Sequence, residues 1–575
     1  MAKITDNSNE LSFHGLTSTS SVLLVPLFQR EYVWTNRQLE RMIAEIEAIA
    51  SGKDTTRFLG AIIAVTRPTN PSQPSPHEIV DGQQRLTTLY MFLAAAAQVA
   101  AKHGQDAYAK GLISTNLIVD WAQEVQVNTK LQPSIADRAQ FKGIFDNLSN
   151  SGSLSDWLPV RAKLPLPSGP EQGALLRQYE RIRKYLLQRL ADDGFDAVEA
   201  LVEVVRNSMT FVFILLKDPG SATTVFEGLN DPGIPISVGD LVKNEVFSKI
   251  GYDEPNARLL HDTRWIPFRD KFGDAFNDYF FPFSVIHRSN TSRTEMFGEL
   301  RKLWVGKDAS AIIANLDEYS DPFRALYGLI DPVVPYGKEV GRAIKRLADM
   351  KCPSSAYPFL MRVLQEYANS IATKQDTLDV LSTVEAFLAR RAICGIEPTG
   401  LLGLFRTMWS KVNGHPTGIR VAQTILERLT VEWPDDQRLA EAIRNRPLYG
   451  SSIARYAILE YDRSLGADHP GTLATIEHVM PQSYCDAWTS VVTKVEHGKL
   501  RHLWANLVPV SKEMNDSVDQ LPYVEKRPFF LDESMFTSTR RLAKDNVSWG
   551  PDQIKTRSGI LADWAKSRWP RPSKN

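Results

Sequence analysis

The chain has 575 residues, of which 43% are hydrophobic and 23% are charged, and its 67 basic and 67 acidic side chains leave no net charge. This length predicts two to four domains, each with enough apolar residues for a core of its own. The balanced charge excludes a protein that binds nucleic acid through bulk positive charge, and the apolar content excludes global disorder.

The first hundred residues contain three runs of strand length. Residues 21–26 and 58–65 are apolar, and residues 78–80 form a shorter run that stops abruptly at Asp81 and Gly82. Short apolar runs bounded by turn residues are typical of buried strands. This end of the chain therefore predicts a small sheet.

The remaining pattern is mostly helical. Asn36 is expected to cap one helix, and apolar residues spaced by three and four predict another over residues 83–101. Helical stretches dominate the rest up to about residue 445, except for an apolar strand at residues 211–216. We therefore expect a multidomain, mainly α protein with α+β regions at both ends, divided into domains at 1–250, 251–445 and 446–575.

Three cysteines, Cys352, Cys394 and Cys485, lie far apart and form no CxxC pair. This pattern argues against a cysteine zinc site and against a disulfide scaffold, so the reducing cytoplasm is the expected location. The first residues are polar, and no apolar run reaches the length of a membrane span. We therefore expect a soluble protein with no membrane partner.

The sequence of the last unit predicts a strand that ends in Glu477 and His478, followed by a loop, a strand at 507–510 and a helix. Asn506 follows His478 by 28 residues, and Asn515 follows nine residues later. This spacing is that of a ββα-metal site. The alternative is a strand end with an ordinary buried histidine.

The residue types of this unit suit phosphodiester cleavage. A hard divalent cation, Mg²⁺ or Mn²⁺, prefers oxygen ligands, here the Glu477 carboxylate and the Asn515 amide oxygen. Such a cation stabilises the charge on the scissile phosphate and the leaving oxygen, while a neutral His478 deprotonates the attacking water. Asn506 is expected to hold either the loop or the imidazole in position.

The tail beyond residue 536 is basic, with nine basic and three acidic residues. Such a segment suits phosphate contacts, or it is an ordinary solvated helix face. Trp549, Trp564 and Trp569 are interleaved with these charges, and we expect them to belong to the core.

Near the N-terminus, Asp81 and Gly82 open the string DGQQR, which predicts a turn from a strand into a helix. The first N–H groups of such a helix and its dipole form an anion site, to which Arg85 and Arg30 could add forked phosphate contacts. No Walker motif occurs in the chain. The alternative is a capped helix with a surface arginine.

A third string covers residues 225–247, with a turn at Asn230 and a helix that Asp240 is expected to cap. Lys243 and Asn244 lie in this helix, and on the residues alone they could simply be its polar face.

Together these strings resemble the GmrSD-type restriction enzymes, which include SspE-like and BrxU-like proteins. QREYVW, DGQQRLTTL and residues 225–247 resemble their ParB-like N-terminal domain, which binds and hydrolyses nucleoside triphosphates. EHVMPQ and NLVPVSKEMND, with Lys526 downstream, resemble their HNH nuclease domain. The resemblance implies nucleotide-binding residues at Gln29, Arg30, Asp81, Gly82, Gln83, Gln84 and Arg85.

The chain departs from the family pattern at two places. Ala505 stands where glycine usually precedes the middle asparagine, and Pro232 with Gly233 replaces a basic residue and glycine. The resemblance also implies possible DNA or nucleotide contacts at Lys243, Asn244 and Lys526. Tyr32, Trp34 or Pro26 could line a pocket that senses a DNA modification.

The resemblance implies a modification-dependent DNA endonuclease of phage defence. Its partner would be double-stranded DNA carrying a sugar-modified base or a phosphorothioate, and a homodimer is a further implication. GTP, UTP, CTP and ATP all remain candidate nucleotides. The alternatives are an NTP-dependent DNA-binding regulator with a non-cleaving HNH fold, and an RNase that uses the same metal site.

Overall fold

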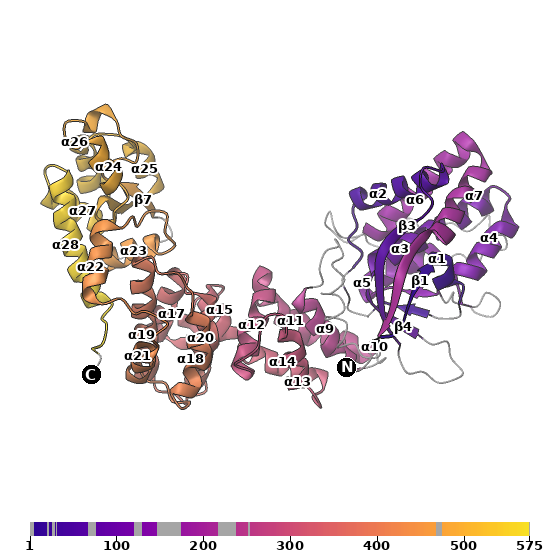
Figure 1. Ribbon diagram of the computed structural model, residues 1–575, viewed down its shortest axis with the longest axis horizontal. Coiled ribbons are helices and arrows are strands. Elements are labelled where there is room, and N and C mark those ends of the chain that lie inside the picture. Colours follow the sequence, from indigo (N-terminus) through magenta and orange to yellow (C-terminus); the bar gives the residue numbers. More distant parts are fainter. Residues whose placement is uncertain are drawn as a thin grey trace. The chain divides into compact units, whose positions relative to one another are not determined.

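The computed structural model divides into two units, Met1–Asp253 and Glu254–Asn575, which are described separately (Figure 1). The finer division into three domains stays a prediction. The structure describes the following residues: 5–19, 22–25, 29, 31–66, 76–119, 129–145, 174–216, 237–250, 254–466 and 474–573.

The first unit is built on a six-stranded mixed sheet with the strand order β1-β6-β3-β4-β2-β5. β3 runs parallel to β6, and β2 runs parallel to both β4 and β5, while β1 and β4 pair antiparallel with β6 and β3. The strands predicted from apolar runs are confirmed. These are β2, β3, β4 and β6, and the bounds of all six strands are β1 (Thr5–Ser12), β2 (Val22–Leu24), β3 (Arg57–Thr66), β4 (Pro76–Asp81), β5 (Leu131–Gln132) and β6 (Met209–Leu216).

Strand β1 is missed by the sequence analysis. Its sequence, TDNSNELS, is almost entirely polar, and it forms an edge of the sheet by pairing with β6 alone. An edge strand is held mainly by backbone hydrogen bonds, so hydrophobic periodicity does not reveal it.

The helical elements from α1 to η3 pack against one face of the sheet and form one large core (Figure 1). α3 is central and buries every side chain except those of Arg85 and Lys102. The other face carries a smaller apolar cluster of β3 and β6 residues. The helical elements are α1 (Phe13–Thr17), α2 (Asn36–Ala50), α3 (Gln83–Lys102), α4 (Asp106–Leu112), η1 (Ile113–Leu117), α5 (Ile135–Phe145), α6 (Ala174–Asp193), α7 (Phe195–Glu203), η3 (Val204–Ser208) and α9 (Val238–Ser248).

Two predicted helix caps are wrong by a few residues. α2 is capped by Thr35, whose N–H donates to Gln38 Oε1 at 3.0 Å in a capping box, so Asn36 is the first helical residue. α9 is capped by Ser237, whose hydroxyl oxygen accepts from the Asp240 N–H. In both cases a hydroxyl residue one to three positions earlier begins the helix.

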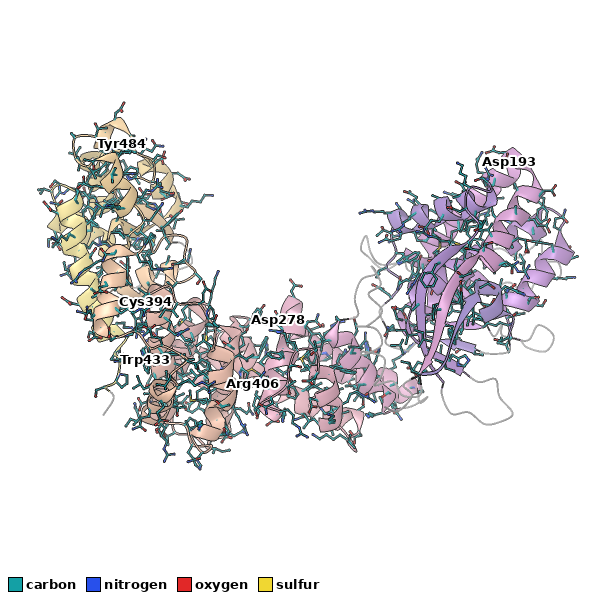
Figure 2. The ribbon with its side chains drawn as sticks, viewed as in Figure 1. Asp193, Asp278, Cys394, Arg406, Trp433 and Tyr484 are labelled. Atoms are coloured by element: carbon teal, nitrogen blue, oxygen red, sulfur yellow. The ribbon has the colours of Figure 1, made fainter. Side chains whose placement is uncertain are left out.

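The second unit is helical except for a two-stranded antiparallel sheet, β7–β8, among the residues described. Its first part confirms the predicted helical stretch. Arg406 of α20 donates to the Thr291 carbonyl oxygen at 2.7 Å and ties that helix to the turn before α13 (Figure 2). The elements of this part are α10 (Glu254–Leu260), η4 (His261–Trp265), α11 (Ile266–Asp270), η5 (Gly273–Ala275), α12 (Phe276–His287), α13 (Met296–Leu303), α14 (Ala309–Asp317), α15 (Ser320–Tyr327), α16 (Val333–Tyr336), α17 (Lys338–Asp349), η6 (Ser354–Ala356), α18 (Tyr357–Ala368), α19 (Lys374–Ile393), α20 (Leu401–Lys411), α21 (Gly418–Glu427) and α22 (Asp436–Asn445).

The rest of this unit begins with α23 and ends with the long helix α28, which packs against α22 (Figure 1). None of the helices described in either unit is long and apolar enough to cross a membrane. The remaining elements are α23 (Ala454–Ser464), β7 (Thr475–His478), η8 (Asp486–Trp488), α24 (Lys494–Leu500), η9 (Trp504–Asn506), β8 (Leu507–Val510), α25 (Lys512–Val518), α26 (Tyr523–Pro528), η10 (Phe529–Glu533), α27 (Thr537–Asp545) and α28 (Pro551–Arg568).

Candidate functional site

Glu477 and His478 are the last two residues of β7, and both are buried. They pair in register with Val508 and Leu507 of β8. α25 follows β8 directly, begins after the Ser511 cap and packs against β7. The predicted order of strand, strand and helix is therefore present, and it places the acid–histidine pair beside α25.

The Glu477 carboxylate is paired with a fully buried ammonium. Lys526 Nζ donates to Glu477 Oε1 at 2.5 Å, to the His478 carbonyl oxygen at 3.0 Å and to the Asp519 carbonyl oxygen at 2.5 Å. Burial raises the pKa of Glu477 and lowers the pKa of Lys526, while each charge opposes the shift of the other. Lys526 was predicted as a possible DNA or nucleotide contact. In this structure Lys526 is fully buried, and it donates to the carboxylate and to the carbonyl oxygens of the strand residue His478 and of Asp519.

The side chain of Asn506 is fully buried and holds the loop between the strands through hydrogen bonds. Its Oδ1 accepts from the Met480 N–H at 2.8 Å and the Trp549 indole at 3.0 Å. Its Nδ2 donates to the carbonyl oxygens of Met480 and Arg501 at 2.8 and 2.9 Å. Of the two predicted roles, Asn506 therefore holds the loop and does not contact the imidazole.

The side chain of Asn515, in α25, differs from that of Asn506 in its hydrogen bonding. Its Oδ1 is buried and has no hydrogen-bond partner within the described part of the chain. A buried carbonyl oxygen without a partner costs free energy unless a ligand satisfies it. Over the same residues, no cluster of three histidine, cysteine or acidic side chains could bind a metal. Any cation here would rest on Glu477, on Asn515 and on water.

The His478 ring is held by a second histidine that the sequence analysis missed. Its Nε2 lies 3.1 Å from Nδ1 of His502, and the ring of Tyr449 packs edge-on against it with centroids 4.4 Å apart. Burial lowers the pKa of His478 to about 3, and the neighbouring His502 and Lys526 add to the shift. His478 is thus neutral near pH 7. The one sequence signal was a histidine four residues before Asn506 in an otherwise apolar segment.

The loop between the strands has further internal supports. His497 Nε2 lies 2.8 Å from the Pro481 carbonyl oxygen, and Arg501 donates to the Gln482 carbonyl oxygen at 2.7 Å. The Tyr484 hydroxyl, labelled in Figure 2, donates to the Val492 carbonyl oxygen at 3.0 Å. These contacts fix the conformation of the loop around the acid–histidine pair.

Several charges of the basic tail serve the fold. Arg557 is buried and donates to the carbonyl oxygens of Ala505 and Leu507 at 2.6 and 2.9 Å, and burial lowers its pKa to about 10. Arg568 donates to Glu385 and Glu460 at 2.5 and 2.8 Å. These two cations are therefore not available for phosphate. Trp549 and Trp569 are buried, as expected, and Trp564 is half-buried.

The DGQQR corner of the first unit forms as predicted. Asp81 is the last residue of β4, and Gly82, with φ +94°, caps α3. A Cβ on Gly82 would lie 2.8 Å from Ile62 Cγ1. Both the positive φ and the close approach require glycine here.

The guanidinium group of Arg85 is engaged with groups of the protein in this structure. It donates to the carbonyl oxygens of Leu59 and of Ala61, the latter at 2.8 Å, and lies 3.3 Å from Asp81 Oδ2. The register of β3 against β6 shifts between Phe58 and Ala61, so Arg85 satisfies carbonyls at an irregular part of the strand. In this structure the side chain therefore shapes the corner, and its direct contact with a phosphate stays a prediction.

The structure brings the predicted N-terminal strings together. Gln84 accepts from the Val33 N–H at 2.9 Å and donates to the Glu31 carbonyl oxygen at 3.1 Å. Gln29 donates to the Val80 carbonyl oxygen at 3.4 Å and accepts from Asn244 Nδ2 at 2.7 Å. α9 and the first loop therefore meet at the end of β4.

The other predicted residues of this region have varied positions. Gln83 is buried, and Lys243 Nζ lies 3.9 Å from Asp240 Oδ1 in its own helix. The buried Oδ1 of Asn244 has no partner among the described residues. Tyr32 is in the core, with its hydroxyl 2.7 Å from Thr88 Oγ1, so it does not line a sensing pocket. Trp34 is half-buried, and three candidates lie outside the described residues: Pro26, Arg30 and Asn230.

Comparison with known families gives two matches. The family described as GmrSD restriction endonuclease, N-terminal domain, matches residues 12–247. The family described as GmrSD restriction endonucleases, C-terminal domain, matches residues 433–564. No curated protein matches the chain significantly. The two matched ranges together span more than half of the sequence and occur in the order of their names, so the chain belongs to the GmrSD family of restriction endonucleases.

Proposed function

We propose that this restriction endonuclease is modification-dependent: it cleaves or nicks modified double-stranded DNA of phages by an HNH reaction, and it is controlled by a nucleoside triphosphate. The proposal is supported by the chain order β7, β8 and α25. The buried Glu477 and the neutral His478 end β7, and α25, which carries the unpartnered amide oxygen of Asn515, packs against that strand.

The residues present fit a hard divalent cation. Glu477 and Asn515 would hold it through oxygen atoms, and Mg²⁺ commonly takes one or two protein ligands and keeps several waters. Mg²⁺ or Mn²⁺ bound there supplies positive charge for the scissile phosphate and the leaving oxygen. Lys526 fixes the Glu477 carboxylate, so the direction of its oxygens is set before any ligand arrives.

His478 is the proposed general base. Burial keeps its imidazole neutral, and a neutral ring can accept a proton from water. The negative phosphate of a bound substrate favours the imidazolium that forms, because opposite charges nearby raise a histidine pKa. Asn506 is a positioning residue that fixes the loop.

For the nucleotide, the proposed site is the corner where α3 begins. Gly82 brings the backbone close to β3, and the helix dipole of the 20-residue α3 favours an anion at its N-terminus. Gln29 and Asn244 meet at this corner, and the unpartnered Asn244 Oδ1 suits a donor from a nucleotide. Arg30, Asp81, Gln83 and Lys243 are further candidate contacts.

The proposed setting is the cytoplasm, with modified DNA as the partner and a homodimer as the candidate assembly. The absence of net charge fits an enzyme that must not adhere to all DNA. A non-cleaving regulator that binds DNA under NTP control is the competing function, since Glu477 is already paired with Lys526.

The test uses the full chain on phage genomes with and without sugar-modified bases or phosphorothioates. Mg²⁺ or Mn²⁺ and each of the four nucleoside triphosphates are supplied in turn. We expect metal-dependent cleavage of one modified class, its loss in His478→Ala, and its retention in Lys555→Ala, a change at an exposed residue. Cleavage by His478→Ala would overturn the assignment of the base. Binding without cleavage under every condition would establish the regulator.

A further inference from the structure

The two histidines of the C-terminal site form a pair with a defined geometry. Nε2 of His478 lies 3.1 Å from Nδ1 of His502, across the two ends of the loop that joins β7 to β8. The His502 carbonyl oxygen accepts from the N–H groups of Leu448 and Tyr449 at 2.8 and 3.2 Å. The backbone of His502 is therefore anchored on the segment before α23, independently of its side chain.

Tyr449 restricts both imidazoles. Its ring lies nearly parallel to that of His502, with an interplanar angle of 9° and centroids 5.4 Å apart, and it meets the His478 ring at 68°. The Tyr449 hydroxyl oxygen accepts from Gln482 Nε2 at 3.3 Å. A ring held on one face and bonded at one nitrogen has little freedom to turn.

We infer that His502 is a positioning residue for the reaction, which selects the tautomer and the direction of His478. This inference rests on the proposed function. A hydrogen bond between two neutral imidazoles needs one N–H donor and one bare nitrogen acceptor. If Nε2 of His478 donates, Nδ1 of His478 is bare and can act as a base. The opposite arrangement places the proton on Nδ1 and removes the base.

The proton balance is simple in the selected tautomer. An O–H bond of the attacking water breaks, and its proton forms a bond to Nδ1 of His478 while the electron pair stays on the hydroxide. The hydroxide forms a bond to phosphorus as the P–O bond to the leaving oxygen breaks, and that electron pair goes to the leaving oxygen. The Nε2 proton stays in place, and its bond to His502 becomes charge-assisted as the imidazolium forms. Among the described residues, Nδ1 of His478 has no hydrogen-bond partner, whereas Nε2 is engaged.

A packing role for His502 predicts different behaviour from a positioning role. His502→Leu keeps an apolar side chain against Tyr449 but removes the acceptor. His502→Asn restores a polar group at the place of Nδ1, and His502→Gln places it further out, at the distance of Nε2. Lys555→Ala is the control, because Lys555 is exposed and contacts neither imidazole.

The assay measures steady-state nicking of supercoiled plasmid by the full chain with Mn²⁺, using whichever modified DNA the wild type cuts. For His502→Leu we expect kcat to fall about 10- to 100-fold with KM and the melting temperature unchanged. His502→Asn is expected to recover most of kcat, His502→Gln little of it, and Lys555→Ala to match the wild type within about threefold.

Wild-type kcat in His502→Leu would overturn the inference, as would equal kcat values in His502→Asn and His502→Gln. If His502→Leu loses its thermal transition, the comparison of His502→Asn with His502→Gln decides the question alone. Failure of the proposed function is distinguishable, because a wild type that cuts no DNA under any condition refutes both statements. A wild type that cuts and a His502 series without effect refute only this one.

Discussion

The DGQQR corner and the β7 strand end both bury polar side chains, and in both most of those side chains bind the backbone of their own unit. Gln84 and Arg85 hold loop and strand groups in the first region, as Asn506 and Lys526 do in the second. Each region also holds one asparagine, Asn244 or Asn515, whose buried amide oxygen has no partner among the described residues. In each region the cationic motif residue, Arg85 or Lys526, therefore supports the local fold in this structure. The unsatisfied neutral amide is the better indicator of where a ligand belongs.

The largest effect is expected when the buried charge of Lys526 is removed. Lys526→Ala leaves the buried Glu477 carboxylate without its counter-ion, and we expect a loss of about 3–5 kcal/mol in the stability of the second unit. Calorimetry of the full chain measures it as a lowered transition for that unit. The double variant Lys526→Met with Glu477→Gln is expected to recover most of the loss. No recovery would mean that the three hydrogen bonds of Lys526, and not its charge, dominate.

Variants of the two asparagines of the C-terminal site test directly which side chain supports the fold and which one binds a ligand. Asn506→Ala removes four hydrogen bonds at a fully buried position and is expected to cost about 2–3 kcal/mol. Asn515→Ala removes an unpartnered oxygen and is expected to leave the melting temperature within a degree or two while abolishing metal-dependent cleavage. Equal stability losses for the two variants would contradict the comparison.

The glycine of the N-terminal corner gives a smaller effect. Gly82→Ala forces an alanine to φ +94° and brings its Cβ within 2.8 Å of Ile62, so we expect a loss of about 2 kcal/mol in the first unit. Gly52→Ala is the matched control, because Gly52 also has a positive φ but nothing lies within 4 Å of its Cβ. Its expected cost is about 1 kcal/mol, from the backbone alone. The thermal transitions of the two variants report the difference.

A test of a different kind concerns pH and the segment that Gln84 holds. Asp137 is buried, accepts from the Tyr32 N–H at 2.8 Å, and burial raises its pKa from 3.8 to about 7. The folded state therefore holds a proton that the unfolded chain releases, so stability declines as pH rises from about 4 to 7 and is level above that. Asp137→Asn is expected to remove this decline and to raise the melting temperature of the first unit at pH 8. A decline that survives in the variant would assign it to other groups.

Local signals in the sequence predicted much of the framework. Apolar runs located β2, β3, β4 and β6, because each buries side chains in a core. The Asp-Gly corner was predictable because only glycine tolerates its backbone there. The polar edge strand β1 was not, since its pairing with β6 depends on residues some 200 positions away.

The candidate site was predictable only in part. The motif located Glu477, His478, Asn506 and Asn515, because their spacing follows the strands that carry them. It gave no sign that Lys526 lies beneath the carboxylate or that His502 and Tyr449 hold the imidazole. Those contacts depend on how the loop and the segment before α23 fold over β7. Nothing in the sequence indicated that Arg85 donates to strand carbonyl oxygens or that Arg568 pairs with two carboxylates, because both contacts are set by packing.

The junction of Arg568 with Glu385 and Glu460 bears on protein engineering. Glu385 of α19 also accepts from the Tyr456 hydroxyl at 2.6 Å and from Arg346 at 2.9 Å. A chimera that transplanted only residues 446–575 would carry Arg568 without one of its carboxylates and would expose the buried Trp569. The exchangeable cassette is the whole of the second unit, so nuclease swaps between relatives should be cut before residue 254.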